Sequence, residues 1–332
     1  MTTTFAGMVN LAAERLGAKT LLASDDFFAE KENLIKAGRG VFIADKYTDR
    51  GKWMDGWESR RKRGPGHDWC VIRLGLDGVV RGVDIDTNHF LGNHPPYASV
   101  DALYVDGDNA DEVAMGEDAD WQEILPRSPL SPGSQNLFAV ESRGAWTHLR
   151  LNIYPDGGVA RFRAYGNVVP RNRELGGTEQ IDLVALENGG RAVACSDMFF
   201  SSMTNLIMPG RGLNMGDGWE SRRRRGPGHD WAILEFARPG TIERLEVDTN
   251  HFKGNYPDHC SIEGCWAPDA EIDILNWSNY EWKPVLGESK LEAHKQHFFE
   301  EELVAQGPFT HVRLNIFPDG GVSRLRVYGR FS

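Results

Sequence analysis

Histidine, arginine and acidic residues crowd into one short segment of this chain, and the segment occurs twice. Residues 55–69 read DGWESRRKRGPGHDW and residues 217–231 read DGWESRRRRGPGHDW, so only Lys62 against Arg224 differs. A guanidinium can hold a carboxylate with two hydrogen bonds. An imidazole beside a carboxylate can exchange protons near neutral pH. The segment is therefore suited to hold a small anion and to perform acid–base chemistry on it.

Two further segments are repeated in the same order. DTNHF occupies residues 86–90 and again 248–252, at the offset that separates the first pair of segments. HLRLNIYPDGG at 148–158 is matched by HVRLNIFPDGG at 311–321. Such long self-similar segments indicate a duplication of a whole domain rather than a short solenoid repeat.

The elements that must position these residues are mostly strands. Apolar residues alternate with polar ones at 149–153, a PDGG turn follows, and the alternation resumes at 162–164. Period-two alternation around such a turn predicts a β-hairpin. A second hairpin is predicted from 69–74, a turn at Asp77-Gly78 and 79–85, and the second copy repeats both. Helical pattern is confined to 288–306 and the N-terminus.

Many short strands joined by Gly/Pro turns favour a mainly β fold, with a sandwich or jelly roll in each half. At roughly 150 residues per domain, the 332 residues of the chain suggest two domains. We expect a first repeat with an N-terminal extension at 1–168, a linker at 169–180 that contains Pro170, Gly176 and Gly177, and a second repeat at 181–332.

The predicted hairpins would assemble a site. The residue that enters the first strand of a hairpin and the residue that leaves the second lie at the same end of the sheet. The loops before 69 and after 85 should therefore meet, and loops on a rigid scaffold often carry function. The candidate catalytic residues are His67, Asp68, Asp86, His89, His229, Asp230, Asp248 and His251. The candidate substrate-binding residues are Glu58, Arg60, Arg61, Asn88, Glu220, Arg222, Arg223 and Asn250.

Structural roles compete with these assignments. Glu58 and Asp68 could simply pair with Arg60 and Arg61 to brace a long loop, because ion-pair networks imitate sites. Two copies do not decide the matter, since a structural loop would be duplicated too. Aromatic core or anchoring roles fit Trp57, Trp69, Trp219 and Trp231. A solvated or salt-bridged strand face fits Arg161, Arg163, Arg324 and Arg326, and a turn role fits Asp156 and Asp319.

A metal or other cofactor has weak support in the sequence. Asp68, Asp86 and His89 could together bind a divalent cation, but their spacing matches no compact ligand motif. Cys260 and Cys265 have no second cysteine pair to complete a zinc site. We therefore assign no metal ligand and expect no certain cofactor, with a divalent metal as the open alternative.

Composition narrows the class of partner. The formal net charge of −11 argues against non-specific nucleic-acid binding, which needs a basic surface. No apolar run approaches the ~20 residues that span a bilayer, and the N-terminal stretch lacks the pattern of a secretory signal. The expected partner is a small-molecule substrate, with neither nucleic acid nor membrane, and the expected location is the cytoplasm.

The three repeated segments resemble the allantoicase (allantoate amidinohydrolase) family, and the resemblance runs from Ser24 to Gly329. It implies a tandem of jelly-roll, galactose-binding-like β-sandwiches that tends to form homo-oligomers. It also implies a hydrolase acting on C–N bonds of linear amidines, which converts allantoate to ureidoglycolate and urea in purine (allantoin) catabolism. In that scheme the arginines hold the substrate carboxylate, Asn88 and Asn250 bond a ureido group, and the histidines exchange protons, oriented by the aspartates.

Two other functions remain open at this point. The strands that close each half in Arg-x-Tyr-Gly also resemble discoidin and galactose-binding sandwiches, which mostly bind without catalysis, so a lectin-like module is the alternative. A lectin site would favour exposed aromatics and few proton donors, whereas these loops are rich in titratable groups. A purely structural tandem would leave both GHDW corners without a role. Fold alone does not decide between them.

Overall fold

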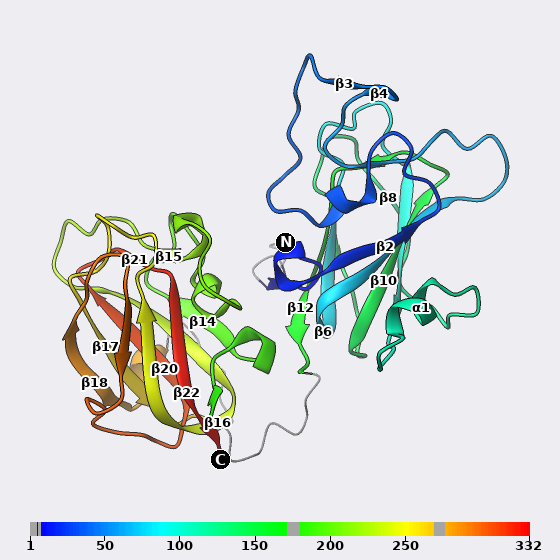
Figure 1. Ribbon diagram of the computed structural model, residues 1–332. Coiled ribbons are helices and arrows are strands. Elements are labelled where there is room, and N and C mark those ends of the chain that lie inside the picture. Colours follow the sequence, from blue (N-terminus) through cyan, green and yellow to red (C-terminus); the bar gives the residue numbers. More distant parts are fainter. Residues whose placement is uncertain (1–4, 6–7, 171–179, 269–275) are drawn as a thin grey trace. The chain divides into compact units, whose positions relative to one another are not determined.

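Strands are the main regular elements of both halves of the chain, as the alternating pattern predicts. The computed structural model describes residues 5, 8–170, 180–268 and 276–332. It divides into two compact units, unit 1 (Met1–Arg171) and unit 2 (Asn172–Ser332) (Figure 1). Most of the predicted linker, at 171–179, lies outside the described residues. The prediction of a mainly β, tandemly duplicated fold is confirmed, because each unit contains its own eight-stranded sheet.

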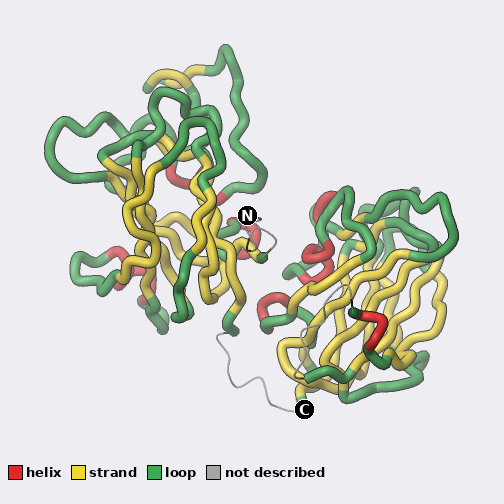
Figure 2. The backbone as a smooth tube through the Cα atoms, turned by 180° about the vertical axis from the view of Figure 1, so that it is seen from behind, coloured by secondary structure: helices red, strands yellow, loops and turns green. Residues whose placement is uncertain are grey.

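Unit 1 consists of strands connected by loops that gather at their ends (Figure 2). Its strands are β1 (Val9–Asn10), β2 (Lys19–Ala23), β3 (Tyr47–Thr48), β4 (Gly51–Lys52), β5 (Trp57–Glu58), β6 (Asp68–Asp86), β7 (Tyr97–Leu103), β8 (Gln122–Pro129), β9 (Leu137–Ala139), β10 (Trp146–Tyr154), β11 (Gly158–Val159) and β12 (Arg161–Val168). Its helical segments are the 3₁₀ turns η1 (Glu14–Leu16) and η2 (Lys31–Ile35) and the short helix α1 (Ala110–Met115).

Unit 2 repeats this architecture. Its strands are β13 (Ile181–Asp182), β14 (Arg191–Cys195), β15 (Trp219–Glu220), β16 (Asp230–Asp248), β17 (His259–Cys265), β18 (Trp282–Lys290), β19 (Gln296–Phe299), β20 (Phe309–Phe317), β21 (Gly321–Val322) and β22 (Arg324–Phe331). Its 3₁₀ turns are η3 (Leu186–Asn188), η4 (Met203–Ile207), η5 (Met215–Asp217) and η6 (Trp277–Asn279).

The predicted strands exist, but the predicted hairpin pairings are wrong. The first half of β6 pairs with β2 and β10, whereas its second half pairs with β9 and β12. The exchange of partners occurs at Gly78, which is in register with Trp146 of β10 and Val168 of β12. The strand therefore passes from one layer of a sandwich to the other. In unit 2, β16 does the same between β20 and β22.

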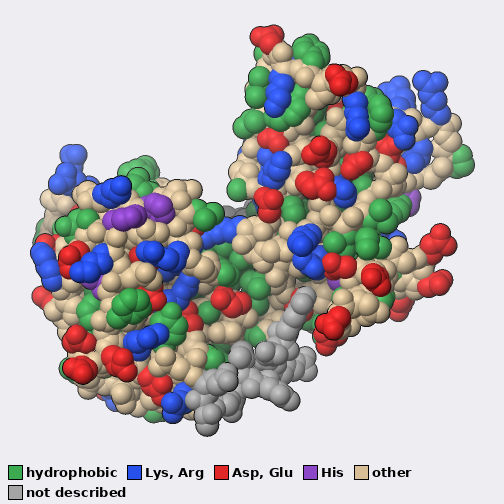
Figure 3. All heavy atoms as spheres, in the orientation of Figure 1, with side chains coloured by type: hydrophobic (Ala, Val, Ile, Leu, Met, Phe, Trp, Pro, Cys, Tyr) green, Lys and Arg blue, Asp and Glu red, His purple; other side chains and the backbone are tan. Residues whose placement is uncertain are grey.

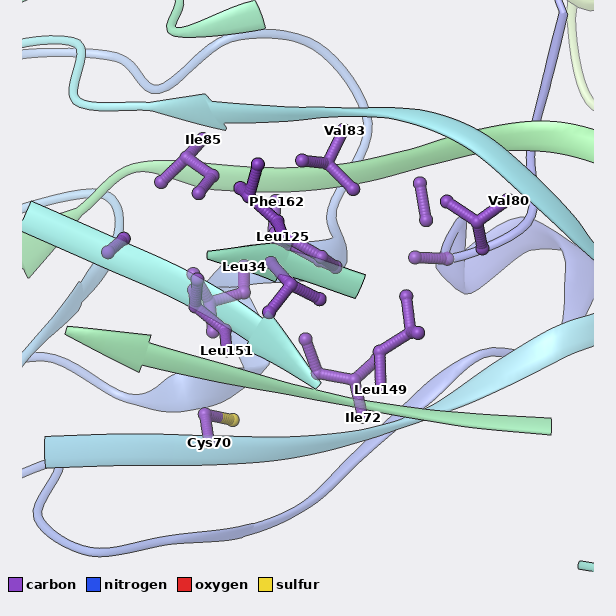
Figure 4. Packing of buried hydrophobic residues seen from close by; sticks show 14 of the residues in the cluster. Leu34, Cys70, Ile72, Val80, Val83, Ile85, Leu125, Leu149, Leu151 and Phe162 are labelled. Atoms are coloured by element: carbon purple, nitrogen blue, oxygen red, sulfur yellow. The ribbon is translucent and has the colours of Figure 1, made fainter. Parts of the chain in front are cut away.

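The core of unit 1 lies between the two layers. In Figure 4, Cys70 and Ile72 face Val83 and Ile85 from the opposite half of the same strand, with Phe162 packed between. Each of these side chains is fully buried. Burying an aliphatic or aromatic side chain of this size contributes about 1.5–3 kcal/mol, so the alternating apolar residues hold the two layers together.

Two expectations of helix are wrong. Residues 288–306 contain the end of β18 and all of β19, and among the described residues near the N-terminus only the three of η1 are helical. In β19 the buried His297 donates from Nδ1 to the carbonyl of Val247 at 3.0 Å, and β19 pairs with β16, so the strand is fixed by this pairing rather than by its own pattern. Tertiary pairing thus overrides a local helical periodicity.

The surface carries mixed charge. Lys and Arg side chains are interspersed with Asp and Glu on the face shown in Figure 3. Within the described residues, no helix has both the length and the apolar character needed to cross a membrane.

Candidate functional site

The two ends of β6 are fastened to one short connection. The amide of Asp68, at the start of β6, donates to the carbonyl of Pro155 at 3.1 Å, and the amide of Ala160 donates to the carbonyl of Asp86, at its end, at 2.7 Å. Residues 155–160 join β10 to β12. Because β10 and β12 pair with opposite halves of β6, this connection brings the 67–68 and 86–89 loops to the same end of the sandwich.

His67 lies at this end with its ring oriented by an amide. Its Nε2 is 3.3 Å from Oδ1 of Asn152, and its ring centroid lies 4.5 Å from that of Tyr154. The amide nitrogen of Asn152 donates in turn to Ser99 and Asp101. The expected orientation of His67 by Asp68 is wrong, because Asn152 occupies that role. His67 is half-buried, so one ring nitrogen remains available for proton exchange.

Asp68 is buried and bound to a cation instead. Its Oδ1 accepts from Nζ of Lys62 at 2.8 Å and from Oγ of Ser24 at 2.8 Å. Its Oδ2 is buried without a hydrogen-bond partner among the described residues. Buried carboxylate oxygens are normally satisfied. Asp68 therefore retains one oxygen that the described residues do not satisfy.

Asp86 is held by an arginine that the sequence did not single out. Nε and Nη2 of Arg39 donate to its two oxygens at 2.8 and 2.9 Å. The backbone amide of Asn88 donates a third hydrogen bond at 2.9 Å. Asp86 is only 2% exposed. With its oxygens bound in this way, it does not orient His89, so that expected pair is also absent.

Asn88 and His89 both contact the carbonyl of Gly40. The side-chain amide of Asn88 donates to this carbonyl at 2.8 Å, and Nε2 of His89 lies 3.1 Å from it. His89 has a φ of 68°, in the left-handed region. A non-glycine residue there costs about 1–3 kcal/mol and persists where the surroundings enforce it. These two residues fix the 38–42 loop, so their direct roles toward substrate remain predictions.

The two arginines of the first loop that were predicted to bind substrate differ in what they contact. Arg60 binds Asp25 through Nε at 2.7 Å and Nη2 at 2.6 Å. Burial alone would raise the pKa of Asp25, but the hydrogen bonds from Arg60 lower it below its usual value. Arg61 is exposed, and within the described residues its side chain forms no hydrogen bond or ion pair. Arg61 is thus the guanidinium free to meet an anion.

Glu58 lies where three loops meet. It pairs with Gly158 in the β5–β11 ladder, bonds the backbone of Ala29, and accepts from the Asn93 amide at 2.7 Å. Burial raises the pKa of Glu58 above its usual value, and the hydrogen bond from Asn93 only partly opposes this. The predicted ion pairs of Glu58 with Arg60 or Arg61 are absent.

Unit 2 repeats each of these contacts. His229 lies 3.2 Å from Asn315 Oδ1, Arg222 binds Asp197, and Asn255 donates to Glu220. Asp230 binds Arg224 and Ser196, Asp248 binds Arg211, and both Asn250 and His251 contact the carbonyl of Gly212. Arg223 is exposed like Arg61.

The structural roles suggested for the tryptophans, the strand arginines and the turn aspartates hold for some of these residues and not for others. Trp57 and Trp219 are fully buried, as expected for core aromatics. Arg161 and Arg324 are salt-bridged but not solvated: they are 3% and 1% exposed and bind Asp55 and Asp217. The PDGG aspartate Asp156 accepts from the amide of Lys62 at 2.7 Å, so it anchors the first loop as well as the turn.

A cavity of about 490 Å³ lies beside this site in unit 1 rather than in it. It is bounded by residues 26–30 and by the β3–β4 hairpin, and none of the predicted site residues lines it. Sixteen positions separate Arg39 from Asp55, but only six separate Arg211 from Asp217, so this hairpin is an insertion that unit 2 lacks. We locate the site by its chemistry, because the cavity contains none of the imidazoles.

Asp68, Asp86 and His89 do not together form a metal site. Each is held by a different partner, namely Lys62, Arg39 and the carbonyl of Gly40. Within the parts of the chain that the structure describes, no three His, Cys, Asp or Glu side chains gather as a metal site would require.

The sequence did not single out Arg39, Asp25 or Asn152, nor the equivalent residues of unit 2. One signal was present: the tripeptide Gly-Arg-Gly occurs at 38–40 and at 210–212, at the offset that separates Ser24 from Ser196. A repeated Arg between glycines, near repeated acidic residues, would have identified the partner of Asp86.

Comparison with known proteins decides the family. A family model described as an allantoicase repeat matches residues 9–169 and again 181–332. The chain belongs to the allantoicase family. It is 53% identical to the probable allantoicase 1 of Burkholderia mallei over 324 residues, which are 97% of this chain and 94% of that protein. It is 50% identical to the probable allantoicase of Photobacterium profundum over 326 residues, or 98% and 97% of the two chains.

Solved structures of allantoicases share the whole fold. The crystal structure of the Saccharomyces cerevisiae allantoicase superposes with a TM-score of 0.80 at 38% identity, covering 97% of this chain and 92% of that one. A second allantoicase structure gives a TM-score of 0.81 at 37% identity, with coverage of 98% and 93%. The family resemblance and the tandem jelly-roll, galactose-binding-like sandwich it implies are thereby confirmed.

Proposed function

We propose that this chain hydrolyses allantoate to ureidoglycolate and urea at the loop end where both ends of the long strand meet. The observation that carries the proposal is the arrangement around residues 155–160: an oriented imidazole, a buried carboxylate with a cation, and a free guanidinium on the adjoining loop. Membership of the allantoicase family supports the same substrate.

The chemistry follows from the substrate. Allantoate carries one carboxylate and two ureido groups on a single carbon. Arg61 is suited to bind the carboxylate, because Arg60 is already bound to Asp25. Breaking one C–N bond requires a proton on the departing nitrogen and the delivery of water to the carbon. We assign proton exchange to His67 in unit 1 and to His229 in unit 2, with Asn152 and Asn315 as the residues that orient them.

The remaining predicted residues support these groups. Asp86, Asn88 and His89, with Asp248, Asn250 and His251, fix the loops that face the substrate. Asp68 and Asp230, which follow these histidines in the sequence, each hold a cation. A lectin-like function is not favoured, because the chain is 50–53% identical over nearly its full length to proteins named as probable allantoicases.

Cellular setting and assembly are part of the same proposal. We place the enzyme in the cytoplasm as a homo-oligomer that acts on a small molecule, without nucleic acid or membrane. Light scattering of the purified chain measures the assembly, and cell fractionation measures the location.

Urea released from allantoate tests the function directly. Wild-type protein should release urea, and the His67→Gln/His229→Gln double variant should lose about 10²–10⁴-fold in kcat. Glutamine can still bond Asn152 and Asn315, so the variant separates proton exchange from folding. Parallel assays with and without chelator determine the metal requirement. Folded wild-type protein that releases no urea would refute the proposal, and a fully active double variant would remove the histidines from it.

A further inference from the structure

The one difference between the two fifteen-residue loops falls on the cation that binds the buried carboxylate. Lys62 stands in unit 1 where Arg224 stands in unit 2, within otherwise identical sequence. Lys62 reaches Oδ1 of Asp68, and Arg224 reaches Oδ1 of Asp230. Both carboxylates are 1% exposed and both also accept from a serine, Ser24 or Ser196.

The two side chains start from the same backbone position. The amide of Lys62 donates to Asp156 at 2.7 Å, and the amide of Arg224 donates to Asp319 at 2.8 Å. The cations therefore occupy equivalent places with equivalent partners. Within the fifteen-residue loop, the two units therefore differ in the kind of cation that binds this buried carboxylate.

That difference is chemical rather than electrostatic. An ammonium group carries three N–H bonds on a nitrogen that can give up a proton, whereas a guanidinium keeps its proton at any pH a protein survives. One N–H of Lys62 is used by Asp68, and within the described residues no second acceptor engages the others. Its side chain is 27% exposed, so a bound molecule can reach it.

We propose that unit 1 is the unit that turns allantoate over and that Lys62 supplies the proton to the departing nitrogen there. In unit 2 the equivalent cation is the guanidinium of Arg224, so the acid assigned to Lys62 is missing there although His229 is in place. The inference rests on the proposed function and extends it by assigning the acid and by distinguishing the two units.

The step balances as follows. The C–N bond breaks, its electron pair goes to the nitrogen of the departing urea, and that nitrogen takes a proton from the Lys62 ammonium. Water bonds to the carbon through oxygen and gives its proton to the imidazole of His67. Solvent then carries a proton from the imidazolium to the neutral Lys62 amine, which restores both groups. The carboxylate of Asp68 holds this amine in place through Oδ1. Its other oxygen, Oδ2, is buried and has no hydrogen-bond partner among the described residues.

Lys62→Arg tests the assignment, because it gives unit 1 the loop that unit 2 already folds with. We expect kcat to fall at least about 10²-fold, with KM and the calorimetric Kd for allantoate changed less than about threefold. Lys19→Arg, on the exposed face of β2, is the matched control and should leave both constants unchanged.

The outcomes separate the two levels of inference. A Lys62→Arg enzyme with wild-type kcat would overturn the role of Lys62, as would a rise in KM at unchanged kcat. Wild-type protein that binds allantoate but releases no urea would instead overturn the proposed function. A fall in kcat at unchanged Kd supports both.

Discussion

Arg39 holds Asp86 through two hydrogen bonds of 2.8 and 2.9 Å, although 47 residues separate them in the chain. Arg211 holds Asp248 in the same way in unit 2. The guanidinium is half-exposed while the carboxylate is buried, so the pair fastens a surface loop to the end of β6 or β16. The loop that carries Gly40, the acceptor for Asn88 and His89, is positioned by this pair.

Arg39→Ala should therefore destabilise unit 1. It leaves a buried carboxylate without its main partner, which costs about 1–3 kcal/mol. Arg39→Lys should lose less, because one charged hydrogen bond can remain. Hydrogen exchange across 68–90 measures the effect, and exchange across 230–252 in unit 2 is the internal control. Unaltered protection at 68–90 in Arg39→Ala would mean that the pair is not a fastening.

The sequence patterns predicted where the strands lie but not which strands pair with one another. Alternation at 69–74, 79–85, 149–153 and 162–164 shows that each segment has one buried face. It does not show whether neighbouring segments pair side by side or face each other across a core. The structure has the second arrangement, because Gly78 lets one strand change layers. Both arrangements return the chain to the end of the sandwich from which it started. The alternation therefore predicts correctly that the 67–68 and 86–89 loops lie at the same end.

The sequence suggested which residue types form the candidate site but not which contacts they make. Sequence adjacency suggested that Asp68 orients His67, yet the two side chains bind different partners. The imidazole meets Asn152 of a neighbouring strand, and Asp68 meets Lys62 and Ser24. Partners such as Arg39 and Asp25 come from distant loops whose approach no local pattern encodes.

Gly158→Ala should distort the connection that fastens both ends of β6. A Cβ at this position would lie 2.0 Å from two ring atoms of the buried Phe90. Overpacking of this kind costs about 1–3 kcal/mol, and we expect kcat to fall as well. Gly64→Ala is the matched control, because nothing lies within 4 Å of its added Cβ. Equal melting temperatures for the two variants would contradict the close packing of Gly158 on Phe90.

Glu58→Gln should stabilise the protein at neutral pH and reduce its activity. Burial raises the pKa of Glu58, so the charged form costs stability above that folded pKa, and the cost disappears as the pH falls through it. Glutamine keeps an acceptor for Asn93 without the charge. Thermal unfolding of both proteins at pH 7 and pH 4 measures the difference. An advantage that is the same at both pH values would show that the charge of Glu58 is not its source.

His311 should make unit 2 sensitive to acid. The side chain is 2% exposed, and burial, with a smaller contribution from the charge of Arg191, lowers its pKa from 6.5 to about 4. The neutral ring bonds Thr310 Oγ1 at 2.9 Å. Between pH 6.5 and 4 the unfolded chain binds a proton that the folded chain does not. Stability therefore falls as the pH falls through this window.

His311→Gln removes this titration, so its stability relative to wild type should rise by about 3 kcal/mol between pH 7 and pH 4. Urea unfolding of both proteins at each pH measures the difference, in which the titrations they share cancel. His148 in unit 1 is the matched comparison. Burial lowers its pKa too, but its Nε2 lies 3.1 Å from Asp111, which opposes the shift. His148→Gln should give a smaller change, and equal changes for both variants would contradict the role of that carboxylate.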